Sequence, residues 1–160
     1  MQKSSKRLED FSLHWKNYVF QVFFATVATF IVLVLLNLNQ AIIVASIGST
    51  AFIVFAMPQY LTAKARNIMG GYAIGLTVGS ICSIIPQSSY FQFIMFSFLA
   101  VGLSIFLMII TDTEHPPASG ATLGIAISGF SLKVVLAAMA SVSILSLIHH
   151  VFKRHLRDLT

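Results

Sequence analysis

The sequence predicts an all-α, polytopic membrane helix bundle with five to six transmembrane segments, and three observations support this. Of its 160 residues, 57% are hydrophobic and only 9% are charged, whereas a soluble domain carries about 25% charged residues. Apolar runs of about 20 residues recur, and such a run crosses a hydrocarbon core of about 30 Å. Only five charged residues lie between Asn17 and Phe152, so most of the charge is at the two ends.

The charge balance excludes several classes of protein. The net charge is +5, which would favour nucleic-acid binding if it covered one exposed face. Because the basic residues cluster at the ends, we interpret them as orientation signals and expect no nucleic-acid partner. The single cysteine, Cys82, lies in an apolar run, which argues against a disulfide framework or a multi-cysteine metal site. We expect no metal, no cofactor and no removable signal peptide.

The N-terminal region is polar but has an apolar stripe. Leu8, Phe11, Trp15 and Tyr18 recur at a spacing of three to four, which is typical of one side of a helix. The sequence leaves open whether this helix lies on the membrane surface, with Trp15 at headgroup depth, or is a solvated lead-in. The expected regions are a cytoplasmic amphipathic segment (1–16), a transmembrane domain (17–152) and a basic cytoplasmic tail (153–160).

The first half of the chain contains three predicted helices. Residues 18–36 are nearly uncharged and rich in Val, Phe, Leu and Ile. Residues 41–57 form a second apolar run, at the short limit for crossing, which stops at Pro58 because helix interiors rarely tolerate proline. After a polar connection, residues 68–85 form a third span.

The second half repeats this layout. Residues 91–110 carry no charge and hold five phenylalanines, so they predict a fourth span. The polar stretch 111–117 follows. Residues 118–130 are apolar, but such a run gives only about 20 Å of helix, too short to span alone. Residues 132–152 form a full final span.

Charge counting favours a fold in which residues 118–130 cross or dip into the membrane. In that arrangement nine basic residues lie on the cytoplasmic side and only Lys133 on the other, a strong positive-inside bias. We therefore expect a multi-pass protein of the cell (inner) membrane with both termini cytoplasmic. The nine are Lys3, Lys6, Arg7, Lys16, Lys64, Arg66, Lys153, Arg154 and Arg157.

Two short sequences suggest an internal repeat. Gly48-Ser49-Thr50 and Gly120-Ala121-Thr122 share a Gly-small-Thr pattern at an offset of 72 residues. Each repeat unit would hold three segments, so the second copy would be inverted, giving a 3+3 inverted repeat with short helices 2 and 5. Such repeats are typical of transporters, whose ligand sites lie where the interrupted helices meet. The alternative is a chance match of three common letters.

Small residues also recur every four positions on two of the predicted helices. They form one face of the third helix and one of the fifth, and such stripes let helix backbones approach closely. We interpret them as packing surfaces. They are Gly71, Gly75, Gly79 and Ser83 on the third helix, and Gly120, Gly124 and Ser128 on the fifth.

The polar stretch before the fifth helix holds the most unusual residues. Asp112, Glu114 and His115 are ionisable groups beside membrane segments, where charge is costly and often functional. The alternative is an ordinary loop, in which Pro116 and Pro117 simply start the next helix.

These residues resemble a known family. Residues 114–122, Glu-His-Pro-Pro-Ala-Ser-Gly-Ala-Thr, are similar to the signature of the HPP family of integral membrane proteins, named for its His-Pro-Pro tripeptide. Residues 63–72 resemble the family's Pro-Arg-Asn followed by Gly-Gly-His, but Ala65 replaces the proline and Tyr72 the histidine. No role of that second histidine is therefore carried over. The resemblance implies a multi-pass membrane protein, and some relatives are associated with nitrite transport.

Physical reasoning adds some support for a small anion as substrate. A helix N-terminus offers unpaired N–H groups and a positive dipole end. We expect the starts of the two short helices to face a shared polar chamber, with Arg66 attracting the anion and Asn67 orienting it. The acidic residues would pair with Arg66 or Lys64 or hold a proton, and His115 would take up charge as the pH falls.

The predicted function is thus a small-anion transporter or channel. Its expected substrate is nitrite or a similar oxyanion, and we expect the movement to be linked to protons. A non-catalytic membrane assembly or regulatory module is the alternative, and an enzyme is not expected. The expected partners are the lipid bilayer, a small inorganic anion and further copies in a dimer or trimer. Candidate substrate-binding residues are Gly48, Ser49, Thr50, Arg66, Asn67, His115, Pro116, Pro117, Ser119, Gly120 and Thr122, and candidate proton-linked or ion-pairing residues are Lys64, Asp112 and Glu114.

Overall fold

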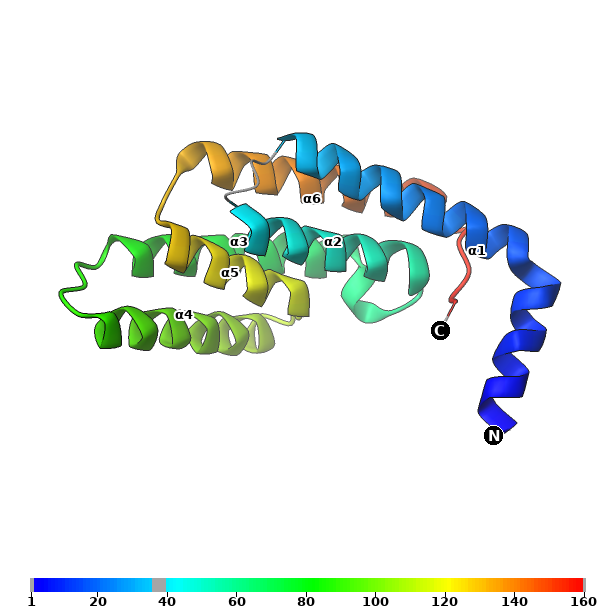
Figure 1. Ribbon diagram of the computed structural model, residues 1–160, viewed down its shortest axis with the longest axis horizontal. Coiled ribbons are helices and arrows are strands. Elements are labelled where there is room, and N and C mark those ends of the chain that lie inside the picture. The colour runs from blue at the N-terminus through cyan, green and yellow to red at the C-terminus, as the bar shows by residue number, and fades with distance from the viewer. Residues whose placement is uncertain (1, 36–39, 160) are drawn as a thin grey trace.

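The computed structural model describes residues 2–35 and 40–159, with side chains from residue 12 onward except at 32, 33 and 35. Within these ranges the chain is all-helical and has no strand (Figure 1), which confirms the predicted all-α class. The elements are α1 (Gln2–Leu35), α2 (Ala41–Ala56), the 3₁₀ turn η2 (Leu61–Ala63), α3 (Ala65–Ile84), α4 (Tyr90–Ile110), α5 (Pro116–Ser128) and α6 (Leu132–Phe152).

The helix boundaries agree closely with the apolar pattern. The last predicted span coincides with α6, and α2 to α5 begin and end within three residues of their predicted bounds. The start of α5 lies at Pro116 rather than at residue 118, because proline at the first position of a helix has a suitable fixed φ and needs no backbone hydrogen bond.

The first helix is longer than the predicted span, because the N-terminal region is helical too. α1 starts at Gln2 and bends at His14, where φ is −126° and ψ is 21°. Figure 1 shows the N-terminal part turned away from the bundle. The side chains of Leu8 and Phe11, and residue 36 of the predicted span, lie outside the described residues. Trp15, just past the bend, is half exposed.

Among the described residues, three helices are long and apolar enough to cross a membrane, namely α3, α4 and α6. Helix α2 is apolar but shorter, with 16 residues. Large apolar side chains are exposed on the outer surface, such as Phe98 and Ile110 on α4. A surface of this kind fits lipid rather than water as its solvent.

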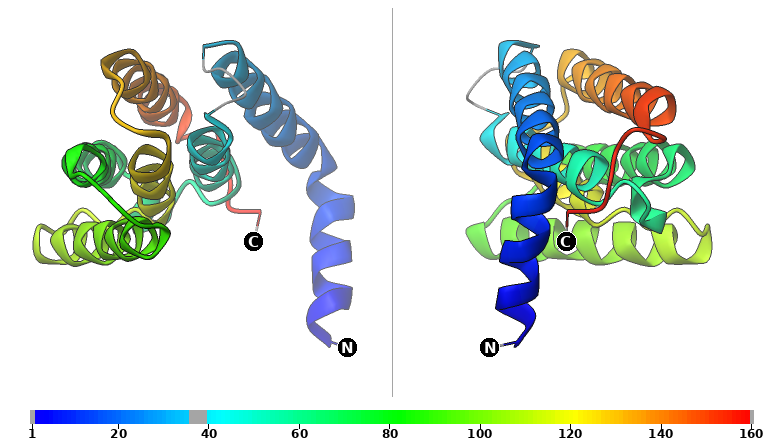
Figure 2. Two further views of the ribbon diagram at one scale, coloured as in Figure 1. Left: turned by 60° about the vertical axis from the view of Figure 1, so that its left-hand side comes forward. Right: turned by 90° about the vertical axis from the view of Figure 1, so that its right-hand side faces the viewer.

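Helix α5 lies at the centre of the bundle, where it packs against α2, α3 and α4. Helices α1 and α4 lie on opposite outer sides (Figure 2). Most of the α5 positions facing these neighbours are fully buried and small, including Ala118 and Ala121. The short helix is therefore largely enclosed by its neighbours.

Glycines allow α3 and α2 to pack closely against α5. A Cβ atom added at Gly75 of α3 would lie 2.6 Å from the Ala118 carbonyl oxygen, and one added at Gly79 would lie 2.6 Å from that of Thr122. On the other side of α5, a Cβ at Gly124 would lie 2.5 Å from Cγ1 of Ile43 in α2. The predicted use of the small-residue stripes as packing surfaces is confirmed.

The chain reverses direction from one helix to the next, so its two described ends lie at the same end of the bundle (Figure 1). The C-terminal segment is fixed there, since the Leu159 N–H donates to the Ala56 carbonyl at 2.8 Å. His149 also bonds the Pro58 carbonyl at 2.8 Å through Nε2. This alternation requires α5 to run through the bundle rather than around it.

Candidate functional site

The site begins where the tripeptide enters α5. His115 is the residue before the helix, in an extended conformation (φ −142°, ψ 91°), and the two prolines occupy the first two helical positions. Neither proline has an N–H, and the Ala118 N–H already donates to the His115 carbonyl at 2.9 Å. The first three positions of α5 therefore offer no free backbone N–H to an anion, contrary to the expectation from the helix N-terminus.

His115 points into the bundle and is 1% exposed. Its Nε2 lies 2.9 Å from Oγ1 of Thr50 in α2, and its Nδ1 lies 2.8 Å from the carbonyl of Thr62 in η2. Its ring also contacts that of Tyr72 in α3, with 5.6 Å between centroids. One imidazole thus ties together three elements around the start of α5.

Hydroxyl groups extend this network across the bundle. The Tyr72 hydroxyl lies 2.9 Å from Oγ1 of Thr50 and 2.8 Å from Oγ of Ser46. Ser46 donates its own hydrogen to the Pro117 carbonyl. All of these side chains are at most 5% exposed. We call the set of Ser46, Thr50, Tyr72 and His115 the buried polar network.

The network is one hydrogen short when His115 is neutral. Because the Thr62 carbonyl can only accept, Nδ1 of His115 carries a hydrogen. Ser46 has given its hydrogen to a backbone carbonyl. Three contacts between side chains remain, from Ser46 through Tyr72 and Thr50 to the imidazole, and they share only two hydroxyl hydrogens. Thr50 can also donate its hydrogen to the Ser46 carbonyl, which lies 3.2 Å from Oγ1. A second proton on His115 would complete the chain.

Burial opposes that second proton. It lowers the pKa of His115 from 6.5 to about 4, although the hydrogen bond to the Thr62 carbonyl works in the other direction. The imidazole of the protein alone is therefore neutral at pH 7, and the structure does not support proton uptake by His115 just below neutral pH. A negative charge placed nearby would favour the protonated form.

A groove of about 590 Å³ lies beside the network, where α2 and α5 cross. The hydroxyls of Ser49 and Ser119 line it, and Ser46 connects it to the buried polar network. Ser49 donates to the Ala45 carbonyl at 3.0 Å, and Ser119 donates to the Pro116 carbonyl at 2.7 Å. The lining is Ile42, Ala45, Ser46, Ser49, Phe52, Ile53, Pro116, Pro117, Ser119 and Gly120. We call it the α2–α5 groove.

The structure brings most of the candidate substrate-binding residues together. Five line the α2–α5 groove and two more, Thr50 and His115, lie in the network behind it. The predicted meeting of the two short helices is therefore present in the fold. The five are Ser49, Pro116, Pro117, Ser119 and Gly120.

Two candidates lie elsewhere. Gly48 faces α1, where an added Cβ would meet Cγ2 of Thr29 at 3.8 Å. Thr122 faces α3 and donates to the Ala118 carbonyl at 3.1 Å. The Gly-small-Thr pattern is also not a helix start: Gly48 lies seven residues after Ala41, inside α2. Its backbone is therefore engaged within the helix, and residues 48–50 do not supply the N-terminal N–H groups expected of a short-helix start.

The charged candidates lie at the end of the bundle that holds both termini. Arg66 Nη1 donates to Oδ2 of Asp112 at 2.9 Å, and both side chains are well exposed. Asn67 is buried and donates to the Glu114 backbone carbonyl at 3.1 Å, which is a structural contact. Lys64 is exposed at the start of α3. Arg66 is thus paired with Asp112, as expected, and so is not an unpaired cation.

Glu114 remains unexplained by these contacts. Its Oε2 is buried and has no hydrogen-bond partner among the described residues. Within the same residues, no three His, Cys, Asp or Glu side chains converge as a metal site would require.

Sequence reasoning missed Ser46, Tyr72 and Thr62. Ser46 precedes Thr50 by four residues and so shares its helix face, a signal that was available. Tyr72 was noted only as a departure from the family pattern. Thr62 contributes a backbone carbonyl, and no side-chain pattern reveals such a role.

Comparison with known proteins agrees with this architecture. Residues 11–158 match the family described as "HPP, transmembrane region". Among curated proteins, a transmembrane protein of Dictyostelium discoideum is 33% identical over 94 residues, which cover 59% of this chain and 33% of that protein. The chain thus spans about a third of the length of this relative. No solved structure matches.

Proposed function

Since the chain belongs to the HPP transmembrane family, we propose that it is a membrane transport protein for nitrite or a similar small oxyanion, which it moves without chemical conversion. The observation that carries this proposal is the α2–α5 groove, where two short helices cross next to a buried polar network. Transporters commonly bind their substrates where interrupted helices meet near the middle of the membrane.

The packing of the helices supports the inverted repeat. Helix α1 packs on α2 as α4 packs on α5, and α3 packs on α5 as α6 packs on α2. Helices α2 and α5 contact each other, as do α3 and α6. Exchanging the two halves of the chain therefore reproduces most of the packing, as a 3+3 inverted repeat requires.

An oxyanion in the groove would use the hydroxyls of Ser49 and Ser119 as donors. Both hydrogens now go to carbonyls of their own helices, so each hydroxyl must rotate to donate. The positive dipole end of α5 lies at the same place and favours an anion even without free N–H groups. The exposed pair of Arg66 and Asp112 lies near the entrance to α5 and sets the local charge there.

A bound anion also provides the proton link. The charge would offset the desolvation that keeps His115 neutral, and the second proton would complete the hydrogen-bond chain to Ser46. Anion and proton would then bind together and move together. Glu114, with its unpartnered Oε2, is the acidic group that we assign to delivering this proton.

We place the chain in the cell (inner) membrane with both termini cytoplasmic. The basic residues of the connections and tail gather at the end of the bundle that holds both termini, whereas Lys133 starts α6 at the other end. The positive-inside rule makes the basic end cytoplasmic. We further propose a homo-oligomer, dimer or trimer, because the α2–α5 groove is open on one side and a second copy would separate it from lipid.

Nitrite influx into vesicles that contain the purified protein tests the proposal. We expect flux above that of protein-free vesicles, and we expect Ser119→Val to reduce it about tenfold or more, since a hydrogen bond to a charged group contributes about 1.5–3 kcal/mol. Ser88→Val is the matched control, because Ser88 is exposed in the connection before α4. Wild-type flux of formate or bicarbonate without nitrite flux would contradict the substrate. No flux of any of the three would contradict transport and favour an assembly module.

A further inference from the structure

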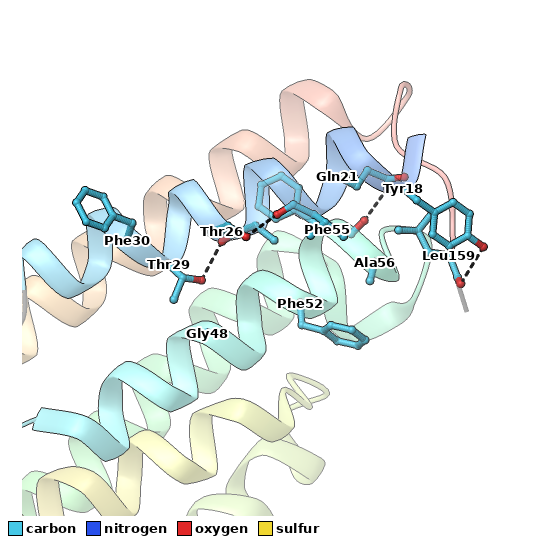
Figure 3. A pocket seen from close by; sticks show the side chains of 12 residues that line it. Tyr18, Gln21, Thr26, Thr29, Phe30, Gly48, Phe52, Phe55, Ala56 and Leu159 are labelled. Atoms are coloured by element: carbon cyan, nitrogen blue, oxygen red, sulfur yellow. Dashed lines mark hydrogen bonds between the residues drawn. The ribbon is translucent and has the colours of Figure 1, made fainter. Parts of the chain in front are cut away.

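A second groove, of about 640 Å³, runs between α1 and α2 (Figure 3). Its lining is almost entirely apolar in character. The threonines do not change this, because Thr26 and Thr29 donate their hydrogens to the carbonyls of Val22 and Ala25 in their own helix. The lining residues on α1 are Tyr18, Gln21, Val22, Ala25, Thr26, Thr29 and Phe30, those on α2 are Gly48, Phe52, Phe55 and Ala56, and Leu159 closes one end.

We propose that this groove binds one acyl chain of an anionic phospholipid, with the phosphate at the basic end of the bundle. The groove follows α1 from Tyr18 to Phe30, a length of about 18 Å at 1.5 Å per residue. One leaflet contributes about half of a 30 Å hydrocarbon core. The groove is thus about as long as the part of one acyl chain that lies within a single leaflet.

The width of the groove suits a chain. Spread over about 18 Å, a volume of 640 Å³ gives a mean cross-section of about 36 Å². A hydrated solute would lose its hydrogen bonds to water against these apolar walls.

The helix packing explains why the groove exists. In the second half of the chain α4 packs extensively on both α3 and α5, whereas α1 packs on α2 and touches α6 only slightly. The outer helix of the first half therefore lacks part of the cover that its counterpart has. A lipid chain in this position would supply the missing contacts.

The end of the groove at Tyr18 is suited to an anionic headgroup. Gln21 is 1% exposed and donates through Nε2 to the Phe55 and Arg157 carbonyls, but its Oε1 is buried without a hydrogen-bond partner among the described residues. A hydroxyl of a glycerol headgroup would satisfy this oxygen. Lys16 and Arg157 are exposed at the same end, and each basic group near the surface favours an anionic lipid by electrostatic attraction.

Native mass spectrometry of the full chain, purified from bilayers that hold equal amounts of phosphatidylglycerol and phosphatidylcholine, tests the proposal. We expect one tightly retained lipid per chain, with phosphatidylglycerol preferred. Gly48→Leu places a side chain in the groove and should reduce lipid retention by about tenfold. Gly102→Leu is the matched control, because an added Cβ at Gly102 of α4 meets nothing within 4 Å.

A second variant separates binding from folding. Lys16→Gln combined with Arg157→Gln leaves the groove intact and should abolish the preference for phosphatidylglycerol while a lipid stays bound. Equal retention by Gly48→Leu and Gly102→Leu would overturn the acyl-chain site. Equal binding of the two lipids by the wild-type chain would overturn the anionic headgroup. An increase in monomer on Gly48→Leu, with no lipid in the wild-type spectrum, would identify a second copy as the occupant and also overturn the proposal.

Discussion

Thr50 holds the centre of the buried polar network, because its hydroxyl contacts both the His115 imidazole and the Tyr72 hydroxyl at 2.9 Å. Replacing it by valine keeps the shape and leaves two buried polar groups short of a partner. Each such group costs about 1–3 kcal/mol. Thr50→Val should therefore lower the thermal midpoint in detergent by several degrees, whereas Ser49→Val, one position along and exposed, should change it little. Equal midpoints for the two variants would contradict the network.

The buried imidazole makes stability depend on pH in one direction. Burial lowers the pKa of folded His115 from 6.5 to about 4, so between these values the unfolded chain binds more protons, and stability falls as pH falls. This term is constant above about pH 7 and costs about 3 kcal/mol by pH 4.

The comparison of wild type with His115→Gln measures this effect, because glutamine does not titrate. Unfolding midpoints between pH 7.5 and pH 4.5 should fall more steeply for the wild type. Parallel pH profiles would show that His115 keeps an ordinary pKa in the folded protein.

Residue patterns predicted which helices meet at the candidate site but not where along each helix the candidate residues lie. The His-Pro-Pro tripeptide and the Gly-small-Thr sequences marked α2 and α5, and these helices do cross. Periodicity shows which residues share a face and says nothing about where a helix begins relative to its neighbour. For that reason Gly48 was a candidate substrate-binding residue, whereas it lies in the middle of α2 and faces α1.

At the scale of elements, the contact between α3 and α5 depends on glycine. A Cβ at Gly75 would lie 2.6 Å from the Ala118 carbonyl oxygen and 2.7 Å from Oγ1 of Thr122. Gly75→Ala should therefore push the helices apart and cost about 1–3 kcal/mol. Gly102→Ala, on an open face of α4, should be neutral or gain up to about 1 kcal/mol. Thermal midpoints of the two purified variants provide the comparison, and a stabilising Gly75→Ala would contradict the close packing.

The ion pair between the start of α3 and the end of α4 has a different role. Arg66 and Asp112 are well exposed, and exposed pairs contribute only about 0–1 kcal/mol to stability. Asp112→Asn should therefore leave the thermal midpoint nearly unchanged. It also removes the negative charge beside the guanidinium, which still donates to the Thr111 carbonyl at 3.0 Å. Nitrite flux should therefore rise at low salt, and Arg66→Gln should lower it.

Salt provides the control for this pair, because screening at 1 M salt reduces the range of electrostatic attraction to about 3 Å. The difference between Asp112→Asn and Arg66→Gln should then disappear. A difference that persists at high salt would mean that the two residues act on the path itself rather than through charge.

Helix positions along the chain were predictable, because long apolar runs separated by polar breaks leave few alternatives in a membrane. The kink at His14 and the groove between α1 and α2 were not, since no sequence pattern marks the bend and the groove depends on how the two helices pack together. Tyr72 illustrates the same limit. In the sequence it is only a departure from a family pattern, and the fold shows that its hydroxyl bonds Ser46 and Thr50.

For the whole molecule, the account requires the α2–α5 groove to be a water-filled path reached from one side of the membrane. The most direct test introduces Cys at Ser49 and Ser119 in a Cys82→Ser background and measures modification by a membrane-impermeant thiol reagent, together with nitrite flux. We predict that both positions react from the same side, that nitrite slows the reaction and that modification blocks flux. If neither cysteine reacts from either side while nitrite still crosses, the solute takes another route and the account is contradicted.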